Sequence, residues 1–381
     1  MSFTQGISGL KAASSSLDVI GNNIANSQTV GFKGARAEFA DMYAGATGIG
    51  TRVTGTDQDF SAGAIEQSSH DLDVAINGSG FFRLNQGNQI VYSRNGQFVM
   101  DKDGFLVNST GGKLTGYAGD VTGGAPDIIQ VDRSSMPAKA TSSAANSYNL
   151  NSNTSVGKGS TRSFTVEDSQ GNKHIVELAF TKTASNTWDV KASIDGRTDN
   201  VQSGTVKFDT SGVLDPSTAK MQLNFGDLKN GTAPLSVAMD FTGSTQFARD
   251  FSDIAISENG YQAGDYSSVK FDKEGHIIAS YSNNQKKTLG TLVMGTFANM
   301  NGLKPIGDTA YVETTESGQA LIGTAGVGPL GDLTPNAREG SNVDMPSELV
   351  NMIISQRNYQ ANSQTIKTQD QILQTVMSMK S

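Results

Sequence analysis

The chain has 381 residues, no cysteine and a formal net charge of -8 at pH 7. That length exceeds what one compact hydrophobic core supports, so it indicates two or three domains. The absence of cysteine excludes disulfides, thiolate catalysis and thiolate metal sites. The negative charge disfavours nucleic acid or an anionic membrane as a partner, because neither would attract the chain. Only 36% of the residues are hydrophobic and 43 are glycine, a composition that favours short strands and many turns over an α/β enzyme.

An N-terminal helix is the first predicted element. Apolar and small residues recur there at alternating spacings of four and three, at positions Phe3, Ile7, Leu10, Ser14, Leu17, Gly21 and Ile24. This 3.5-residue repeat predicts one strand of a coiled coil. The alternative is an ordinary amphipathic helix that packs on a globular domain. Three asparagines, Asn22, Asn23 and Asn26, suit the end of this helix.

The N-terminal segment also bears on how the protein reaches its place of action. It has no basic stretch followed by a continuous apolar run, so we expect no cleavable secretory signal. The chain has no run of 18 apolar residues, so we expect no membrane insertion. If the protein works outside the cell, it leaves by a route that does not use the usual signal.

Strands and turns are predicted for most of the middle of the chain. Trp188, Val190, Ala192 and Ile194 alternate with polar residues, which indicates a strand with one buried face. A hairpin signature recurs three times, as FVMDKDGFL at 98–106, VKFDTSGVL at 206–214 and VKFDKEGHI at 269–277. In each copy apolar residues flank an Asp-x-x-Gly turn, whose glycine supplies a positive φ.

A segment rich in Ser, Thr and Asn at 134–163 marks a domain boundary, and residues 250–261 are the best candidate for the return crossing. The predicted arrangement is nested. Residues 1–70 and 341–381 form a terminal helical assembly domain with its linker, residues 71–140 and 256–340 form a discontinuous first β domain, and residues 141–255 form an inserted outer β domain.

A long C-terminal helix is predicted because residues 341–381 contain no glycine. Asp344 can cap its start, and Pro346 falls in the first turn, where its missing N–H costs nothing. One face is diluted by polar residues and follows the same repeat; its main members are Met352, Ser355, Tyr359, Asn362, Ile366, Gln369, Leu373 and Val376. So polar a face predicts a helix that packs against something other than its own core.

We find no pattern that indicates catalysis or ligand binding. His70, His174 and His276 lie far apart in sequence, without a second histidine or carboxylates spaced as a ligand set, so we expect structural or solvent-exposed roles for them. No serine, lysine or tyrosine lies in a nucleophile motif. The sequence therefore predicts no enzyme activity, no cofactor and no metal site. The strongest remaining pattern is that of the two terminal helices, and it predicts assembly.

Four stretches carry a resemblance to a known family. NNIANSQTVGFK at 22–33 closely resembles a signature of the bacterial flagellar rod and hook protein family, and residues 341–373 resemble its C-terminal hallmark. Residues 72–84 and 92–117 look like the β domain that this family shares. The residues that match the N-terminal signature, and to which the resemblance assigns a role in assembly, are Asn22, Asn23, Ile24, Ala25, Asn26, Gly31, Phe32 and Lys33.

The resemblance implies a mainly β, multidomain protein with discontinuous domains, whose long terminal helices form a coiled-coil inner layer. A large inserted domain and the segment 253–303 are similar to the hook subunit within this family. The implied function is that of a structural subunit that self-assembles into a curved hollow tube, a universal joint that transmits torque from rod to filament. The helix-face residues expected at subunit interfaces are Phe3, Ile7, Leu10, Leu17, Met352, Tyr359, Ile366, Leu373 and Val376.

The implied location is the extracellular hook of the flagellum, reached through the flagellar type III export apparatus. The implied partners are further copies of the chain in a helical homopolymer, the rod protein below, the hook–filament junction protein above and the hook cap protein. A distal rod or related axial protein is the main alternative. A secreted β-rich adhesin, anchored by its terminal helices, is a third reading.

Overall fold

The structure is a computed structural model that describes residues 3–44, 47–119, 121 and 123–379. It is mainly β, with one helix near each end of the chain, as predicted. The chain divides into two compact units. Unit 1 holds the described residues of Met1–Arg133, Ser268–Ala279 and Lys286–Ser381, and unit 2 holds Ser134–Ser267 and Ser280–Gln285.

The two helices belong to unit 1. Helix α1 spans Phe3–Ala25 and helix α2 spans Met345–Met379. The start of α2 confirms the sequence prediction, because Asp344 Oδ2 accepts a hydrogen bond from Ser347 N at 3.3 Å and Pro346 lies in the first turn. Among the described residues, no helix combines the length and the apolar content needed to cross a membrane.

The β part of unit 1 is built around one large sheet, in which β5 runs between β9 and β6 and pairs with both. Two strands of a long hairpin and two short two-stranded sheets complete the unit. The bounds of these strands are β1 Ala35–Ala44, β2 Thr47–Gln58, β3 Ile65–Gln67, β4 Val74–Asn77, β5 Phe81–Gln86, β6 Gln89–Ser93, β7 Val99–Met100, β8 Leu106–Val107, β9 Lys113–Ala118, β10 Asp127–Ile128, β21 Lys286–Leu292, β22 Met294–Thr296, β23 Lys304–Gly307, β24 Ala310–Val312, β25 Leu321–Gly323, β26 Asp332–Pro335 and β27 Ala337–Glu339. Strands β19 (Tyr266–Phe271) and β20 (His276–Tyr281) extend this sheet and cross the boundary between the units.

An aromatic cluster fills part of the core of unit 1. Phe81, Tyr92, Phe297 and Tyr311 are buried together with Leu303. The rings of Tyr92 and Phe297 meet edge to face with centroids 4.8 Å apart, a geometry that adds to the stabilisation from area burial alone. This cluster packs β5, β6 and β24 against one another.

Unit 2 is a sandwich of two four-stranded sheets, in the orders β12-β13-β14-β15 and β16-β17-β11-β18. Its strands are β11 Ser143–Asn149, β12 Gly159–Glu167, β13 Lys173–Ala184, β14 Thr187–Ile194, β15 Gln202–Lys207, β16 Lys220–Gly226, β17 Leu235–Asp240 and β18 Ser252–Glu258. Buried residues alternate along β13, β14 and β17, so that each strand turns one face to a shared core. The predicted alternation in β14 is confirmed, since Trp188, Val190, Ala192 and Ile194 are all fully buried.

The three predicted Asp-x-x-Gly turns are confirmed at Asp101, Asp209 and Asp272. At Asp101, the carboxylate Oδ1 accepts hydrogen bonds from Asp103 N at 2.9 Å and from Phe105 N at 2.8 Å, while Gly104 has a φ of 85°. Two further copies that the sequence analysis missed start at Asn108 and Asp168 and make the same two side-chain bonds. One local chemistry thus closes tight connections in both units.

Candidate functional site: the terminal helices and their junction

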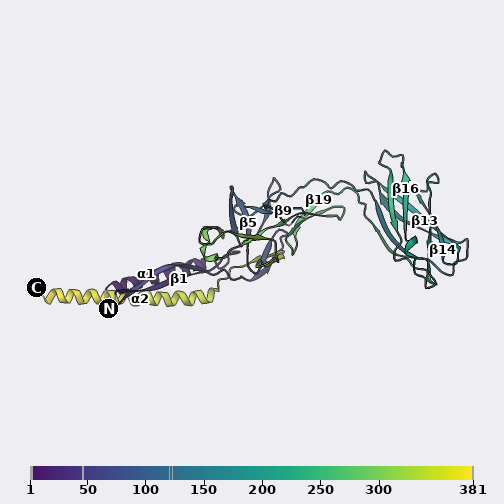
Figure 1. Ribbon diagram of the computed structural model, residues 1–381. Coiled ribbons are helices and arrows are strands. Elements are labelled where there is room, and N and C mark those ends of the chain that lie inside the picture. Colours follow the sequence, from purple (N-terminus) through teal and green to yellow (C-terminus); the bar gives the residue numbers. More distant parts are fainter. Residues whose placement is uncertain (1–2, 45–46, 120, 122, 380–381) are drawn as a thin grey trace. The chain divides into compact units, whose positions relative to one another are not determined.

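Helices α1 and α2 pack along each other in unit 1 (Figure 1). Gly6 lies against Ile366, Gly9 lies against Asn362, and the hydroxyls of Ser16 and Ser355 are 3.1 Å apart. The residue numbers on one helix rise as those on the other fall, so the pair is antiparallel. The two glycines allow close approach, because a Cβ at Gly9 would lie 2.7 Å from Asn362 Oδ1.

The α1 face that packs on α2 differs from the face that the large apolar residues predicted. The contacts with α2 come from Gly6, Gly9 and Ser16, and the buried residues of the helix are Gly6, Ala13, Ile20 and Asn23. The buried residues fit the same three- and four-residue spacing, but each lies one residue before a predicted position. This shift corresponds to a rotation of roughly 100° around the helix axis. The signal that would have found the contact with α2 is a stripe of small residues that includes Gly6, Gly9 and Ser16, which permits close packing where bulky side chains do not.

The predicted apolar stripe on α1 is less buried than the face that carries Gly6 and Ala13. Phe3 is 46% exposed and Ile7 is 36% exposed, while Leu10 and Leu17 are half-buried. Nothing within unit 1 covers the outer side of Phe3 or Ile7 among the described residues. Their role at subunit interfaces therefore stays a prediction.

On α2 the predicted face contributes Ser355, Asn362 and Ile366 to the contact with α1. Met352 is half-buried and Tyr359 is exposed. Beyond Asp370 the described end of α2 is exposed on all sides, and it extends past the N-terminal end of α1 (Figure 1). The exposed apolar residues there include Ile372, Leu373, Val376 and Met377.

The segment after α1, predicted as a linker, instead forms the β1–β2 hairpin, which packs against a second face of α1. Gln5 Nε2 donates to Gly48 O at 2.6 Å, and Thr51 N donates to Ser8 Oγ at 3.3 Å. The alternation of small apolar and charged residues in Ala35–Ala44 is the signal for a strand that sequence reasoning overlooked.

The N-terminal family signature forms the junction between α1 and the β part of unit 1. Asn23 is buried and pairs with the backbone of Ala35, its Nδ2 donating to Ala35 O at 2.7 Å and its Oδ1 accepting from Ala35 N at 3.0 Å. Asn26 Nδ2 donates to Asn22 O at 3.0 Å, and this carbonyl also accepts from Asn26 N at 3.1 Å at the end of the helix. Ile24 and Phe32 are half-buried and Ala25 is exposed.

Gly31 is required where the chain turns into this junction. Its φ is 71°, and an added Cβ would lie 2.6 Å from Asn95 N and 2.7 Å from Arg94 C. Gly31 N donates to Glu339 O at 2.8 Å. The backbone of the signature thus lies directly against the loop after β6.

A buried charge cluster of Lys33, Arg94 and Glu339 lies beside Gly31. Lys33 Nζ lies 2.7 Å from Glu339 Oε1, and Arg94 Nη1 lies 3.5 Å from Glu339 Oε2. The side chains of Lys33 and Glu339 are fully buried, and that of Arg94 is 2% exposed. Gly63 N also donates to Glu339 Oε1, at 2.9 Å. One carboxylate therefore joins the start of the chain, the loop after β6 and the strand that leads to α2.

The cluster is buried, and burial shifts the pKa values of its two cations. Burial lowers the pKa of Lys33, and the charge of Arg94 lowers it further, against the opposing effect of Glu339. Burial also lowers the pKa of Arg94. Because each cation is costly to bury alone, the cluster depends on all three members being present.

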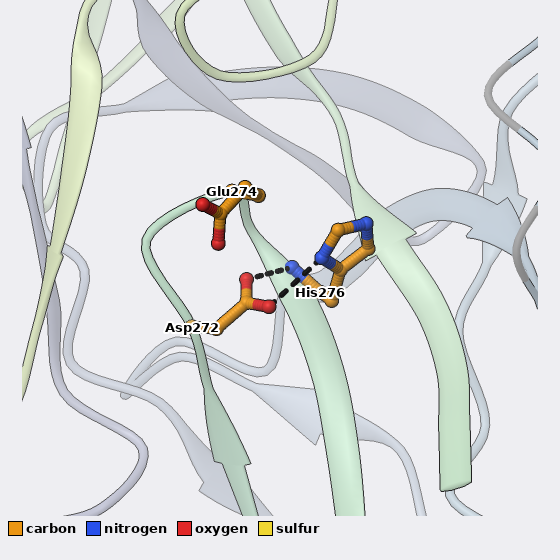
Figure 2. Close-up of side chains that lie close together, drawn as sticks. All are labelled: Asp272, Glu274 and His276. Carbon is orange, nitrogen blue, oxygen red and sulfur yellow. Dashed lines mark hydrogen bonds and ion pairs between the residues drawn. The ribbon is translucent and has the colours of Figure 1, made fainter. Parts of the chain in front are cut away.

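The histidines occupy three different settings. His70 is exposed, whereas His174 is buried in unit 2 between two aspartates. His276 lies in the third predicted turn, where Asp272, Glu274 and His276 place possible ligand atoms within 4.8 Å of one another (Figure 2). Sequence spacing was not interpreted as a possible ligand set here, whereas the structure brings two carboxylates close to this histidine. Both oxygens of Asp272 bond to His276, Oδ1 to the backbone N at 2.7 Å and Oδ2 to Nδ1 at 2.8 Å, so turn geometry accounts for the group.

Comparison with protein-family models gives four matches along the chain. Residues 4–33 match the flagella basal body rod protein and residues 75–156 match the D1 domain of the flagellar hook protein FlgE/F/G. Residues 130–261 match the D2 domain of the flagellar basal body protein FlaE, and residues 335–379 match the C-terminal model of the flagellar basal body rod FlgEFG protein.

Full-length relatives and a solved structure agree with these matches. In structure the chain resembles the Helicobacter pylori flagellar hook protein FlgE2 with a TM-score of 0.53 and 13% identity, over 70% of this chain and 98% of that one, which supports the fold. The flagellar hook protein FlgE of Borreliella burgdorferi is 31% identical over 100% of this chain and 99% of its own. The FlgE proteins of Salmonella typhimurium and Escherichia coli are each 43% identical over the full length of both chains. The chain therefore belongs to the flagellar hook protein family.

Proposed function

We propose that this chain is the structural subunit of a bacterial flagellar hook, assembling with copies of itself into a curved hollow tube that joins rod to filament. The observation that carries this proposal is the apolar surface on the terminal helices that the subunit leaves uncovered. Leu373 and Val376 are each 57% exposed on the end of α2, and Phe3 is 46% exposed on α1. Apolar residues clustered on exposed helices mark an interaction surface.

The free end of α2 continues the face that already binds α1. Leu373 lies one heptad beyond Ile366, so both fall on the same side of the helix. Ile366 contacts Gly6 of α1, whereas Leu373 is 57% exposed next to the described residues of α1. We infer that a neighbouring copy covers this face and that such contacts, repeated around the tube, form a coiled-coil inner layer.

The β units suit an outer layer whose contacts change as the tube bends and rotates. Unit 2 carries polar surface on β16 and β17, where Ser236 Oγ donates to Asn224 Oδ1 at 2.6 Å and accepts from Gln222 Nε2 at 2.8 Å. Polar surfaces exchange partners at small cost, because water replaces each lost hydrogen bond. Subunits could then slide without dissociating while the apolar helices hold the tube together.

Membership of the family supports further proposals about location and partners. We infer an extracellular, non-catalytic role, with export through the flagellar type III apparatus. The neighbours would be the rod protein below, the hook–filament junction protein above and the cap protein during growth. A distal rod or related axial subunit is the second candidate, favoured by the match of residues 4–33 and 335–379 to rod-type models.

Electron microscopy of a strain that lacks the gene tests the proposal. We expect basal bodies with complete rods and no hooks, and we expect hooks to return when the wild-type gene is supplied. Rods that end early would favour the distal rod protein. Intact hooks and filaments with normal swimming would refute both assignments.

A further inference from the structure

His174 occupies an unusual position at one end of the unit 2 sandwich. It is 9% exposed, and both of its ring nitrogens face carboxylates. The distance from Nδ1 to Asp195 Oδ2 is 2.7 Å, and that from Nε2 to Asp168 Oδ2 is 3.1 Å. Asp168 is fully buried, whereas Asp195 is partly exposed.

Hydrogen-bond chemistry decides the charge of this histidine. Ionised carboxylates only accept hydrogen bonds, and a neutral imidazole can donate from one nitrogen only. Asp168 is ionised because both of its oxygens already accept hydrogen bonds, Oδ1 from Gln170 N at 2.8 Å and Asn172 N at 2.9 Å, and Oδ2 from Asn172 Nδ2 at 2.9 Å. Asp195 Oδ1 accepts from Ile175 N at 2.9 Å. Both contacts of His174 are satisfied together only when the ring carries two protons.

We propose that His174 is held as an imidazolium between Asp168 and Asp195 and acts as an alkali-sensitive clasp at this end of unit 2. The clasp joins parts of both sheets. Asp168 belongs to the β12–β13 turn, and Asp195 follows β14. Asp168 Oδ2 also accepts from Asn230 Nδ2 at 2.9 Å, and Asn230 lies in the connection between β16 and β17 of the other sheet.

The same turn lies beside the segments through which the chain passes into and out of unit 2. Gln262 Nε2 donates to Gly171 O at 3.0 Å, and a Cβ on Gly171 would lie 2.9 Å from Ala138 Cβ. Those segments pair with each other through the backbone of Lys139 and Tyr261. Loss of the clasp should therefore also destabilise the paired segments around Lys139 and Tyr261.

The direction of the pH effect follows from the groups around the ring. Burial lowers the pKa of His174, but the hydrogen bonds and charges of Asp195 and Asp168 outweigh it and raise the pKa above the ordinary histidine value. Burial acts to raise the pKa of Asp168, yet hydrogen bonds from Asn172 and His174 hold it well below the usual range. Arg197, on the same loop as Asp195, pairs with Asp199 at 2.9 Å.

A raised folded-state pKa means that protonation stabilises the folded unit. The stabilisation is fully present below the unfolded value of about 6.5 and is lost as the pH rises through the folded value. Unit 2 should consequently become easier to unfold across the neutral-to-alkaline range.

The sole tryptophan of the chain makes this testable in the full-length protein. Trp188 is fully buried in the core of unit 2, where its Nε1 donates to Gln246 Oε1 at 2.7 Å. Its fluorescence therefore reports the unfolding of this unit. We expect the urea midpoint of the wild type to fall between about pH 6 and about pH 9, and we expect His174→Gln to remove most of that fall. His276→Gln is the matched control, since it removes a turn histidine with one aspartate partner from unit 1, and it should leave the Trp188 transition unchanged.

A second measurement does not depend on how well His174→Gln folds. In the double variant His70→Gln/His276→Gln, His174 is the sole histidine, so its ring resonances can be followed by NMR against pH without ambiguity. We expect a titration midpoint above about 6.5 and a lower midpoint when Asp195→Asn is added. A midpoint at or below the ordinary value, or a pH dependence of the Trp188 transition that His174→Gln leaves intact, would overturn the proposal.

Discussion

Glu339 is the residue on which the junction of the terminal segments depends. It faces two buried cations, Lys33 and Arg94, and accepts the backbone N–H of Gly63. Buried ion pairs often contribute little net stability, yet removal of one member leaves the others uncompensated in a poorly hydrated site. The value of the cluster is specificity, because it joins residues that lie 306 positions apart in the sequence.

Glu339→Gln should destabilise unit 1 by about 3–5 kcal/mol, because it leaves two buried cations without their carboxylate. Glu66→Gln is the matched control. It breaks an exposed pair with Arg338, whose N–O distance is 3.0 Å, and it should cost less than about 1 kcal/mol. Urea unfolding followed by circular dichroism measures both, with Trp188 fluorescence as a separate monitor of unit 2. Equal, small effects of the two variants would contradict the role given to Glu339.

Gly31→Ala should destabilise unit 1 by at least about 2 kcal/mol, because it combines a left-handed backbone with a backbone clash. Gly21→Ala is the contrasting change within α1, since an added Cβ there would meet nothing within 4 Å. It should stabilise the helix by about 0.5–1 kcal/mol. Thermal unfolding of the two variants should therefore shift in opposite directions, and a neutral Gly31→Ala would show that the junction can relax.

At the scale of elements, α1 has three faces with different partners. One face of small residues packs on α2, a second packs on the β1–β2 hairpin, and a third carries Phe3 and Ile7. Close packing inside the subunit uses Gly6 and Gly9, so the larger apolar side chains remain outside. In the proposed assembly, this division lets the same helix fold within its own subunit and bind a neighbour.

Leu373→Asp should abolish polymerisation and leave the subunit folded. The side chain is 57% exposed in the subunit, so the change should alter its stability by less than about 0.5 kcal/mol. In a polymer the aspartate would be stranded in an apolar interface. Gln371→Asp adds the same charge on the opposite side of α2 and should still polymerise. The measurements are sedimentation and electron microscopy of purified protein, with a thermal melt of each variant. A sharply lower melting temperature for Leu373→Asp would show that the residue supports the fold of the subunit.

At the scale of the whole molecule, most of unit 2 is one continuous stretch, Ser134–Ser267, whose first and last segments pair antiparallel, and Ser280–Gln285 also belongs to this unit. Lys139 and Tyr261 exchange both backbone hydrogen bonds, at 2.9 and 3.0 Å. The segments on either side of residues 140–260 are therefore adjacent within unit 2. The sequence-based division into three domains, with boundaries at residues 70, 140, 255 and 340, stays a prediction.

Replacing residues 140–260 by Asn-Gly should leave unit 1 folded, because this two-residue turn suits a hydrogen-bonded antiparallel pair. We expect the shortened chain to form tubes that are straight, since outer contacts select curvature in the proposed layering. Circular dichroism checks the fold, and electron microscopy of the polymer checks the shape. Normally curved hooks with normal swimming would remove unit 2 from the bending mechanism. A folded chain that never polymerises would show that unit 2 carries essential lattice contacts.

Local patterns were sufficient to predict a large part of this structure. The lack of glycine and the capping residues predicted α2, alternation predicted β14, and Asp-x-x-Gly predicted three turns, because each of these depends on residues close in sequence. The terminal signatures likewise pointed to the family. What these patterns have in common is that backbone conformation is chosen mainly by neighbours within one or two turns of chain.

Only the tertiary structure decided which faces and which charges meet. The packing face of α1, the β1–β2 hairpin, the Lys33–Arg94–Glu339 cluster and the setting of His174 between two aspartates all depend on contacts between distant segments. No periodicity encodes such contacts, since burying a charge is tolerable only once its partner has been brought to it by the fold. The sequence alone thus determined the elements and the family of this protein, while long-range packing determined the junction that ties its two ends together.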